Sequence, residues 1–373
     1  MISIWEQESF LSYDTIIVGA GISGLSTAAS LKEKDPNHNI LVLERGLLPT
    51  GASTKNAGFA CFGSISELSQ DRKTLGDTGM IALVNQRWNG LQKTISRLGE
   101  DKIGLERKGG YEMIDDATEC YLNELDETNE LLKPIFDSKT FSLCDKQIEK
   151  FGFRNIKHLV YNSFEGQLHT GKLMKSLWEY CNELGIHILT GAHVDRYEST
   201  DHGVDVICGD LKFQAKSLAF CTNAFANELL GDQLEIKPGR GMVMLIKPSK
   251  KLRLEGTFHY QEGYYYFRDF GGKLIFGGGR NLDFEGETTT EFGLNQKIED
   301  KLHTYLREVI LPDSNYETEL RWSGIMAFGE NKSPIVRKIS DHIFVGVRLG
   351  GMGVAIGSMV GEDLANLILK TFN

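Results

Sequence analysis

The chain lacks the features that mark a membrane protein, a metal protein or a secreted protein. It has no run of 18 consecutive apolar residues, so no membrane-spanning helix is expected. Its six cysteines are scattered and form no C-x-x-C pair, so neither a metal site nor a disulfide framework is predicted. The first 13 residues contain no lysine or arginine, so no signal peptide is expected. A soluble protein of the reducing cytoplasm is the resulting prediction.

Acidic residues also outnumber basic residues. The chain has 41 lysines and arginines against 51 aspartates and glutamates, which gives a net charge of −10. Nonspecific binding to nucleic acid or to an anionic membrane needs a basic surface, so neither partner is predicted. Glycine, in contrast, is abundant: 41 of the 373 residues are glycines, which indicates tight turns or a backbone that approaches a ligand closely. A chain of this length also predicts two domains.

The first 44 residues have the pattern of a strand, a glycine-rich turn, a helix and a second strand. Residues 16–18 and 40–43 are short apolar runs typical of buried parallel strands, and residues 22–34 have a helical pattern. Between the first strand and the helix, residues 19–24 read G-A-G-I-S-G, and Glu44 follows twenty residues later. A glycine fingerprint in this context predicts a dinucleotide site.

Each residue type in the fingerprint has a physical reason. Gly19 permits the tight turn, and Gly21 lets the backbone approach a pyrophosphate. Gly24 allows the helix to pack closely on the strand, and the helix N-terminus offers free N–H groups to the phosphates. Glu44, at the end of the second strand, is placed to accept hydrogen bonds from ribose hydroxyls.

The rest of the chain alternates between α/β segments and a β-rich block. Residues 50–64 show no period and are interpreted as a long loop, whereas residues 79–99 and 116–136 are interpreted as helices. Further predicted elements are a helix near 173–184, strands at 186–189, 204–207 and 217–221, strands at 242–246, 257–260, 264–268 and 274–277, a helix at 294–310, a strand at 343–345 and a helix at 357–371. The predicted fold is α/β, with a Rossmann-type nucleotide-binding domain of discontinuous segments (1–84, 152–229 and 324–373) and an inserted α+β substrate domain (85–151 and 230–323) that carries a mostly antiparallel sheet.

The fingerprint alone does not separate FAD from NAD, but longer segments resemble a known superfamily. Residues 13–28, the loop GASTKNAG at 51–58, EGQL at 165–168 followed by His193-Val194, and TNA at 222–224 resemble the D-amino acid oxidase superfamily, which includes glycine, sarcosine and gamma-glutamylputrescine oxidases. RWSGIM at 321–326, PIV at 334–336 and GVRLGGMG at 346–353 resemble that family's W-x-G segment, the proline after it and its last flavin-contacting loop.

The resemblance implies that the dinucleotide is FAD. In that family, the last loop presents backbone N–H groups and a helix end to the flavin, which stabilises negative charge on the reduced ring. The residues predicted to contact FAD are Gly19, Gly21, Ile22, Ser23, Gly24, Glu44, Arg45, Ala52, Ser53, Lys55, Asn56, Ala57, Gly58, Val194, Thr222, Asn223, Arg348, Gly350, Gly351, Met352, Gly353 and Val354.

The chain departs from the family pattern at several positions. Leu349 stands where many members have histidine, and Met326 stands where several have arginine. The loop at 51–58 resembles the loop that passes the flavin ring in the family and is called the flavin loop here. It contains no histidine, and no cysteine lies near the C-terminal loop at 346–353, so the resemblance implies noncovalent FAD. Cys61 is interpreted as an inert buried thiol. Some members use a lysine to activate oxygen. In this chain that position falls near Ile275, so the lysine is expected to be absent, and both oxygen and another carrier stay open as the electron acceptor.

Candidate substrate-binding residues lie in one predicted strand and two glycine-rich loops. Tyr264, Tyr266 and Arg268 alternate along the strand and share a face, which makes either a carboxylate site or an ordinary half-buried sheet surface. Arg348 and Lys55 are the other candidates because their loops are expected to touch the flavin. The predicted catalytic residues are therefore Tyr264, Tyr266, Arg268, Arg348 and Lys55. His259 is interpreted as a structural histidine.

The resemblance implies an FAD-dependent amine or amino-acid oxidase or dehydrogenase. The expected reaction is hydride transfer from the carbon that bears nitrogen to flavin N5, which gives an imine. Three alternatives stay open: a 2-hydroxy-acid or polyol dehydrogenase with a non-oxygen acceptor, the oxidase-like half of a tRNA-modifying enzyme, and a nonenzymatic nucleotide-binding protein. The acidic charge argues against the tRNA enzyme. The predicted partner is a small amine or amino acid, and the oligomeric state is left open.

Overall fold

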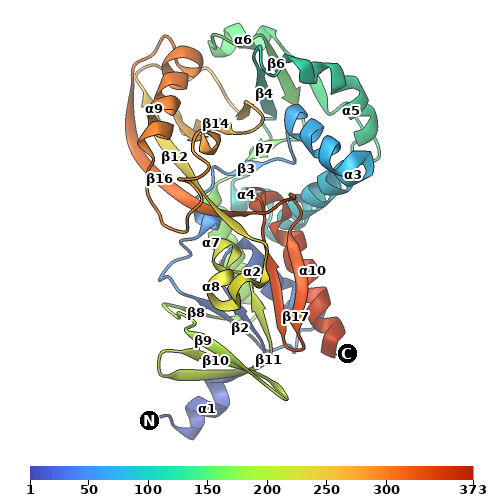
Figure 1. The fold of residues 1–373 in the computed structure, drawn as a ribbon, viewed down its shortest axis with the longest axis vertical. Helices are drawn as coiled ribbons and strands as arrows, with labels where there is room; N and C mark the ends of the chain where they lie inside the picture. The colour runs from blue at the N-terminus through green and yellow to red at the C-terminus, as the bar shows by residue number, and fades with distance from the viewer. Residues whose placement is uncertain (373) are drawn as a thin grey trace.

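A computed structural model describes residues 1–372 and places them around two eight-stranded sheets. The first sheet lies in the lower half of Figure 1 and the second in the upper half. The order of the first sheet is β17-β18-β11-β1-β2-β8, and β10 and β9 extend it from β11. Its strands are β1 (Ser12–Val18), β2 (Ile40–Glu44), β8 (His187–Thr190), β9 (Arg196–Thr200), β10 (Gly203–Cys208), β11 (Leu211–Phe220), β17 (Ile335–Ser340) and β18 (Ile343–Val347).

The parallel centre of this sheet is the predicted nucleotide-binding layer. β1 pairs in parallel with β2 and β11, and β11 pairs in parallel with β18. The apolar runs of these strands are buried on both faces. The helices α2 (Ile22–Lys34), α7 (Thr170–Glu183) and α10 (Gly353–Phe372) cover one face, and α2 packs against both of the others. Residues of β10 and of the segment 226–234 cover the other face. A sheet built from three distant chain segments, within residues 12–44, 187–220 and 335–347, confirms the predicted Rossmann-type layer.

The second sheet is antiparallel apart from one pair, as predicted. Its order is β16-β12-β15-β14-β13-β4-β6-β5, and only β13 and β4 pair in parallel. Its strands are β4 (Gly110–Ile114), β5 (Phe141–Leu143), β6 (His158–Asn162), β12 (Lys237–Pro248), β13 (Thr257–Tyr260), β14 (Tyr265–Phe270), β15 (Lys273–Gly278) and β16 (Tyr316–Phe328). The other elements are α1 (Ile4–Phe10), α3 (Ile65–Leu98), α4 (Glu100–Ile103), α5 (Leu125–Leu132), α6 (Lys146–Phe151), α8 (Asn227–Leu230), α9 (Gln296–Tyr305) and the pair β3 (Phe59–Ala60) and β7 (Gly166–Gln167).

Several predicted element boundaries differ from the observed ones. α3 begins at Ile65 rather than near residue 79, because the capping box of Ser64 and Glu67 starts a helix that continues past a kink at Gly76. The segment 50–64, interpreted as an unbroken loop, contains a short 3₁₀ turn at 52–54 and strand β3. The helix expected at 116–136 is a 3₁₀ turn followed by the short helix α5.

The predicted domain limits also do not coincide with the division between the sheets. β6 at residues 158–162 pairs with β4 and β5 in the second sheet, although the predicted limit is at residue 152. β16 continues to Phe328 in the second sheet, beyond the limit at residue 324. The division into a cofactor domain and a substrate domain stays a prediction, with these strands assigned to the second sheet.

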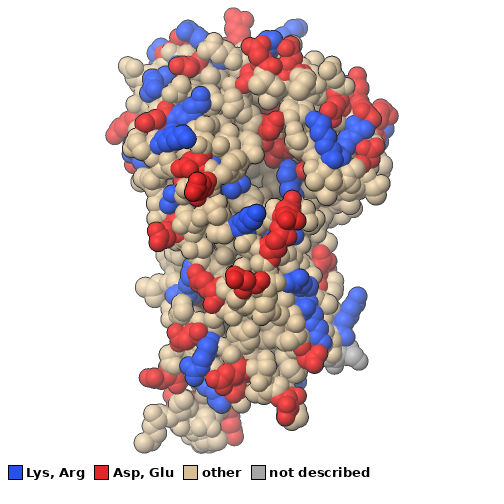
Figure 2. Space-filling view, viewed as in Figure 1, with Lys and Arg blue, Asp and Glu red and all other residues tan. Residues whose placement is uncertain are grey.

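The distribution of surface charge and the length of the helices relate to the predictions about nucleic-acid and membrane partners. In the face shown in Figure 2, acidic and basic side chains are interspersed over both halves. Across residues 1–372, no helix is long and apolar enough to cross a membrane.

Candidate active site

A cavity of about 730 Å³ is lined by residues from both sheets. Its lower part is formed by the loops that follow β1, β2 and β11, where the carboxyl ends of parallel strands meet. This is the position at which open α/β sheets bind their ligands. Its upper part is formed by side chains of β12 to β16. The volume lies within the range of small-molecule and cofactor sites.

The glycine turn after β1 has the geometry that the fingerprint predicts. Gly19 has a φ of +102°, which favours glycine. A Cβ at Gly24 would lie 1.9 Å from the carbonyl oxygen of Gly19, so helix α2 could not approach the strand with any other residue there. A Cβ at Gly21 would meet Ser53 Oγ at 2.8 Å, and that oxygen accepts a hydrogen bond from the amide of Ile22. The turn and the first flavin loop are therefore joined directly.

Glu44 lies at the end of β2 with its carboxylate fixed. One carboxylate oxygen accepts a hydrogen bond from the amide of Ala20 at 3.0 Å, and the other accepts one from the amide of Gly46 at 3.0 Å. The side chain is buried and lines the cavity. Each carboxylate oxygen has a second lone pair, so the held carboxylate can still accept bonds from a ribose.

The loop at 52–58 is fastened to the second sheet. The Asn56 amide donates to the carbonyls of Ala52 and Ser53, and its oxygen accepts from the amide of Gly58. The indole of Trp322 on β16 donates to the carbonyl of Lys55 at 2.9 Å. These bonds hold the loop in one shape, with residues 55–58 lining the cavity.

The C-terminal loop turns sharply before α10. Arg348, Gly350 and Gly351 all have positive φ. The side-chain oxygen of Asn223 accepts bonds from the amides of Arg348 and Leu349, which ties this loop to the end of β11. α10 then begins at Gly353 beside the cavity. Its first N–H groups have no partner within the helix, so this end is suited to carry negative charge.

The hydrogen-bonding groups that line the cavity fit an FAD molecule. The buried hydroxyl of Thr222 lines the cavity and has no hydrogen-bond partner within residues 1–372, as expected of a group that awaits a ligand. The starts of α2 and α10 both border the cavity. Of the residues predicted to contact FAD, all but Gly24 and Arg348 line it. Gly24 acts through packing, as its predicted role requires.

The two arginines predicted to anchor a substrate carboxylate do not line this cavity. Arg268 is buried, and its guanidinium donates to the carbonyls of Ala57, Leu168 and Asp269. Arg348 is also buried, and its guanidinium donates to the carbonyls of Ser333 and Glu235 and to the side-chain oxygen of Asn331. Their N–H donors already bind oxygen atoms inside the protein, so we look for another residue as the candidate anchor of a substrate carboxylate.

Arg280 is a cavity-lining cation that the sequence patterns did not identify. Its guanidinium carbon lies 3.9 Å from the centroid of the Phe328 ring and 4.9 Å from that of Phe284. Within residues 1–372, no carboxylate lies at ion-pair distance from it. Burial lowers its pKa from the ordinary value. The available sequence signal was its place directly after three glycines at the end of a predicted strand.

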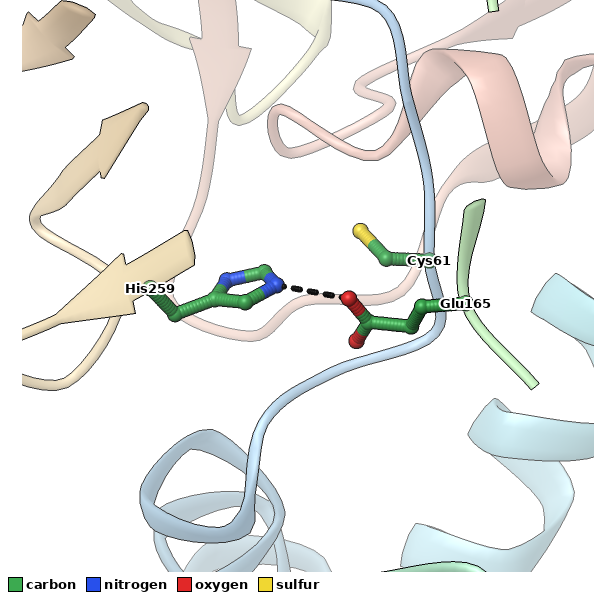
Figure 3. Close-up of side chains that lie close together, drawn as sticks. All are labelled: Cys61, Glu165 and His259. Carbon is green, nitrogen blue, oxygen red and sulfur yellow. Dashed lines mark hydrogen bonds and ion pairs between the residues drawn. The ribbon is translucent and has the colours of Figure 1, made fainter. Parts of the chain in front are cut away.

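A cluster of buried titratable groups, His259, Glu165 and Cys61, lies at the upper cavity, which His259 and Cys61 line (Figure 3). His259 Nε2 lies 3.0 Å from a carboxylate oxygen of Glu165. A ring nitrogen of His259, a carboxylate oxygen of Glu165 and the Sγ of Cys61 all lie within 4.8 Å of one another. Burial opposes protonation of His259, but the charges of Glu165 and Glu67 outweigh it and raise its pKa to about 9. Burial also raises the pKa of the Cys61 thiol, so the thiolate is disfavoured.

The cluster predicts a fall in stability with rising pH. A histidine whose pKa rises from 6.5 to about 9 on folding stabilises the folded state fully below pH 6.5. That contribution disappears as the pH passes through about 9. We expect the free energy of unfolding to fall between pH 7 and pH 9, by up to about 3 kcal/mol. Urea unfolding at saturating FAD measures it. His259→Gln should flatten this fall, whereas the exposed control His202→Gln should keep it. An unchanged slope in His259→Gln would assign the titration to another group.

Comparisons with known proteins agree with this geometry. A family model described as FAD-dependent oxidoreductase matches residues 14–367. The "Probable oxidoreductase OrdL" of Haemophilus influenzae is 22% identical over 370 residues, which cover 95% of this chain and 83% of that protein. The structure of glycine oxidase from Geobacillus kaustophilus superimposes with a TM-score of 0.77 at 20% identity, over 96% of this chain and 95% of that one. L-proline dehydrogenase from P. horikoshii gives 0.76 at 16% identity, over 96% and 94%.

The family match spans nearly the whole chain and includes both sheets. The cavity, the glycine turn and the unpartnered Thr222 hydroxyl supply the site that such a cofactor needs. The predicted resemblance is therefore confirmed: the chain belongs to the D-amino acid oxidase family of FAD-dependent oxidoreductases, and its cofactor is FAD.

Proposed function

We propose that the protein oxidises a small amine-bearing carboxylic acid at the carbon that bears nitrogen, giving an imine that water hydrolyses. The observation that carries this proposal is the unpaired guanidinium of Arg280 in a cavity that otherwise suits FAD and a small ligand. The names of two similar structures, glycine oxidase and L-proline dehydrogenase, support an amino-acid substrate. The bound flavin would supply the hydride acceptor.

Arg280 is proposed as the carboxylate anchor. A guanidinium presents a planar fork of N–H donors that matches a carboxylate. The Phe328 and Phe284 rings restrict its motion and remove water from it, which strengthens a charge-assisted bond. Without a protein carboxylate beside it, the cation is free to meet a substrate.

Tyr266 is proposed to orient the substrate beside this anchor. Its ring lies against Gly277 on the neighbouring strand, where a Cβ would come within 2.9 Å of the ring. Burial raises the pKa of Tyr266 to about 12, so its phenol stays protonated at neutral pH and remains a hydrogen-bond donor. Tyr264 and Lys55 also line the cavity and stay candidates for substrate contact.

An anaerobic screen tests the proposed function. Loss of the flavin absorption is measured with matched sets of amino acids, simple amines and 2-hydroxy acids. Amino acids are expected to bleach the flavin faster than amines of the same carbon skeleton, because only they offer Arg280 a carboxylate. If 2-hydroxy acids bleach the flavin and amino acids do not, the alternative dehydrogenase function replaces this one.

The flavin is expected to leave the chain on denaturation. Within residues 1–372, the cavity lining includes the cysteines Cys61 and Cys221 and the histidines His193 and His259. Burial raises the pKa of both thiols, so their thiolates are disfavoured. His193 lies 3.3 Å from Asp195 and His259 lies 3.0 Å from Glu165, so none of the four is suited to a covalent bond to flavin. Acid precipitation followed by filtration should give a yellow filtrate and a colourless pellet. Flavin that stays with the pellet would contradict the noncovalent assignment.

Reoxidation by oxygen is expected to be slow compared with reoxidation by an acceptor dye. Ile275, near which the oxygen-activating lysine of some relatives would fall, is buried in an apolar cluster with Ala57, Val243 and Leu245. No amine is therefore available at that place beneath the flavin loop. Stopped-flow mixing of reduced protein with air-saturated buffer measures the rate, and a dye reaction under the same conditions is the comparison. Rapid return of the yellow colour with oxygen would assign the protein as an oxidase.

A further inference from the structure

Two ends of the substrate cavity have opposite charge, and the sheet sets the distance between them. β13 and β15 both pair antiparallel with β14, so they run in the same direction and end at the same edge of the sheet. Glu262 lies two residues beyond the end of β13, and Arg280 lies two residues beyond the end of β15. Since one strand separates β13 from β15, the two positions are about 10 Å apart.

The backbone that carries Glu262 is strained. Gln261, Glu262 and Gly263 have φ values of 48°, 58° and 78°, and the first two are not glycines. Residues held in this left-handed region cost free energy and are found at functional sites. The Glu262 carboxylate accepts a hydrogen bond from the hydroxyl of Tyr121 at 2.6 Å and lines the cavity. In the described part of the chain, no lysine, arginine or histidine lies at ion-pair distance from it.

A second carboxylate lies next to the same turn. The carboxyl carbon of Glu67, on the first turn of α3, would be 2.7 Å from a Cβ at Gly263. Glu67 is 20% exposed and lines the cavity, and its nearest cationic atom is His259 Nδ1 at 3.6 Å, beyond hydrogen-bond distance. The turn 261–263 is therefore flanked by two carboxylates, neither of which has a cation at hydrogen-bond distance.

The cations around this end are paired with carboxylates other than Glu262. Lys332 and Arg87 also line the cavity, but both pair with the buried Asp71, at 2.5 Å and 3.4 Å. His259 lies between Glu165 and Glu67. The cations His259, Lys332 and Arg87 thus lie beside Glu165, Glu67 and Asp71, and Lys73 lies over the Tyr121 ring with its Nζ 5.1 Å from the centroid. Burial raises the pKa of the nearby Glu112 to about 7, so this group is not counted as a full negative charge. Among the described residues Glu262 has no cation at ion-pair distance, so a positive group of a ligand would pair with it.

We propose that the substrate is an amino acid with a second, cationic group, whose carboxylate binds Arg280 and whose distal ammonium or guanidinium binds between Glu67 and Glu262. This proposal rests on the proposed function, because it uses Arg280 as the carboxylate anchor. A basic side chain of a few methylenes spans a distance of the order that separates the two ends. A second carboxylate would be repelled at this end, and a neutral side chain would leave Glu262 without a cation.

Arginine and citrulline provide the test, because they differ mainly in the charge of the distal group. Each enantiomer is added anaerobically to the FAD-bound protein. Binding is measured from the change in the visible flavin spectrum, and reduction from the later bleaching. The expected result is at least a tenfold lower Kd and a higher reduction rate constant for one enantiomer of arginine than for the same enantiomer of citrulline. Glu262→Gln combined with Glu67→Gln should remove this preference by weakening arginine alone. The exposed control Glu285→Gln, which does not line the cavity, should keep it.

The outcomes separate this inference from the function on which it rests. If both ligands bind and bleach the flavin equally, and Arg280→Met weakens both, the amino-acid function stands and the cationic substrate is wrong. The cationic substrate is also wrong if the double variant weakens citrulline as much as arginine. If neither ligand binds or bleaches while 2-hydroxy acids do, the inference and the amino-acid function both fail.

Discussion

Glu44→Lys is expected to raise the dissociation constant for FAD about a hundredfold or more. The carboxylate accepts bonds from the amides of Ala20 and Gly46 and faces the cavity at the end of β2. Lysine cannot accept these bonds, and it would place a buried cation beside two backbone donors. The loss of the ribose acceptor adds to this effect. A total of about 3 kcal/mol corresponds to the stated change in affinity.

Titration of the apoprotein with FAD, followed by flavin fluorescence, measures the change. Glu44→Gln keeps an acceptor oxygen and should lose less affinity than the lysine variant. Glu198→Lys makes the same charge change on exposed strand β9 and serves as the matched control. Circular dichroism of each apoprotein separates weaker binding from a misfolded turn. An unchanged FAD affinity in a folded Glu44→Lys protein would remove Glu44 from the cofactor site.

The cofactor half of the site could be predicted because its residues are close in sequence. The turn at Gly19 to Gly24, the loop at 52–58 and the loop at 346–354 each bring a short segment to the cavity. Positive φ at Gly19 and the small residues of the two loops set much of this backbone conformation locally, and Trp322 and Asn223 then fasten the two loops from distant segments. A pattern of residue types therefore carries most of the information, and a family resemblance transfers it.

The substrate half could not be predicted in the same way. Alternation along a strand predicted that Tyr264, Tyr266 and Arg268 share a face, but it gave no information about hydrogen-bond partners. Tyr264 and Tyr266 line the cavity, whereas Arg268 donates to the carbonyl of Ala57. The carbonyls of Ala57 and Leu168 that engage Arg268 come from segments 100 or more residues away. Arg280 was missed for the related reason that Phe328, the ring nearest to its guanidinium, comes from β16 and meets it only in the folded chain.

Arg280→Met is expected to raise the KM for an amino-acid substrate at least tenfold and to leave FAD binding unchanged. The substitution keeps much of the length and the apolar stem but removes the guanidinium. A substrate carboxylate would then be buried near Phe328 and Tyr266 without a cation, which is costly. Loss of such a contact typically costs about 2–5 kcal/mol. Steady-state kinetics with a dye acceptor measures KM, and the flavin spectrum reports an intact cofactor site.

Three further variants make the assignment specific. Arg280→Lys should restore affinity only in part, because an ammonium group cannot form the two parallel bonds of a guanidinium. Arg268→Met and Arg348→Met should instead lower the free energy of unfolding, because each leaves backbone carbonyls without their donors. Their KM should change little in whatever fraction folds and binds FAD. If Arg280→Met keeps the wild-type KM while Arg348→Met or Arg268→Met raises it, the anchor is one of the residues that the sequence first suggested. In that event the guanidinium must leave its internal partners when substrate binds.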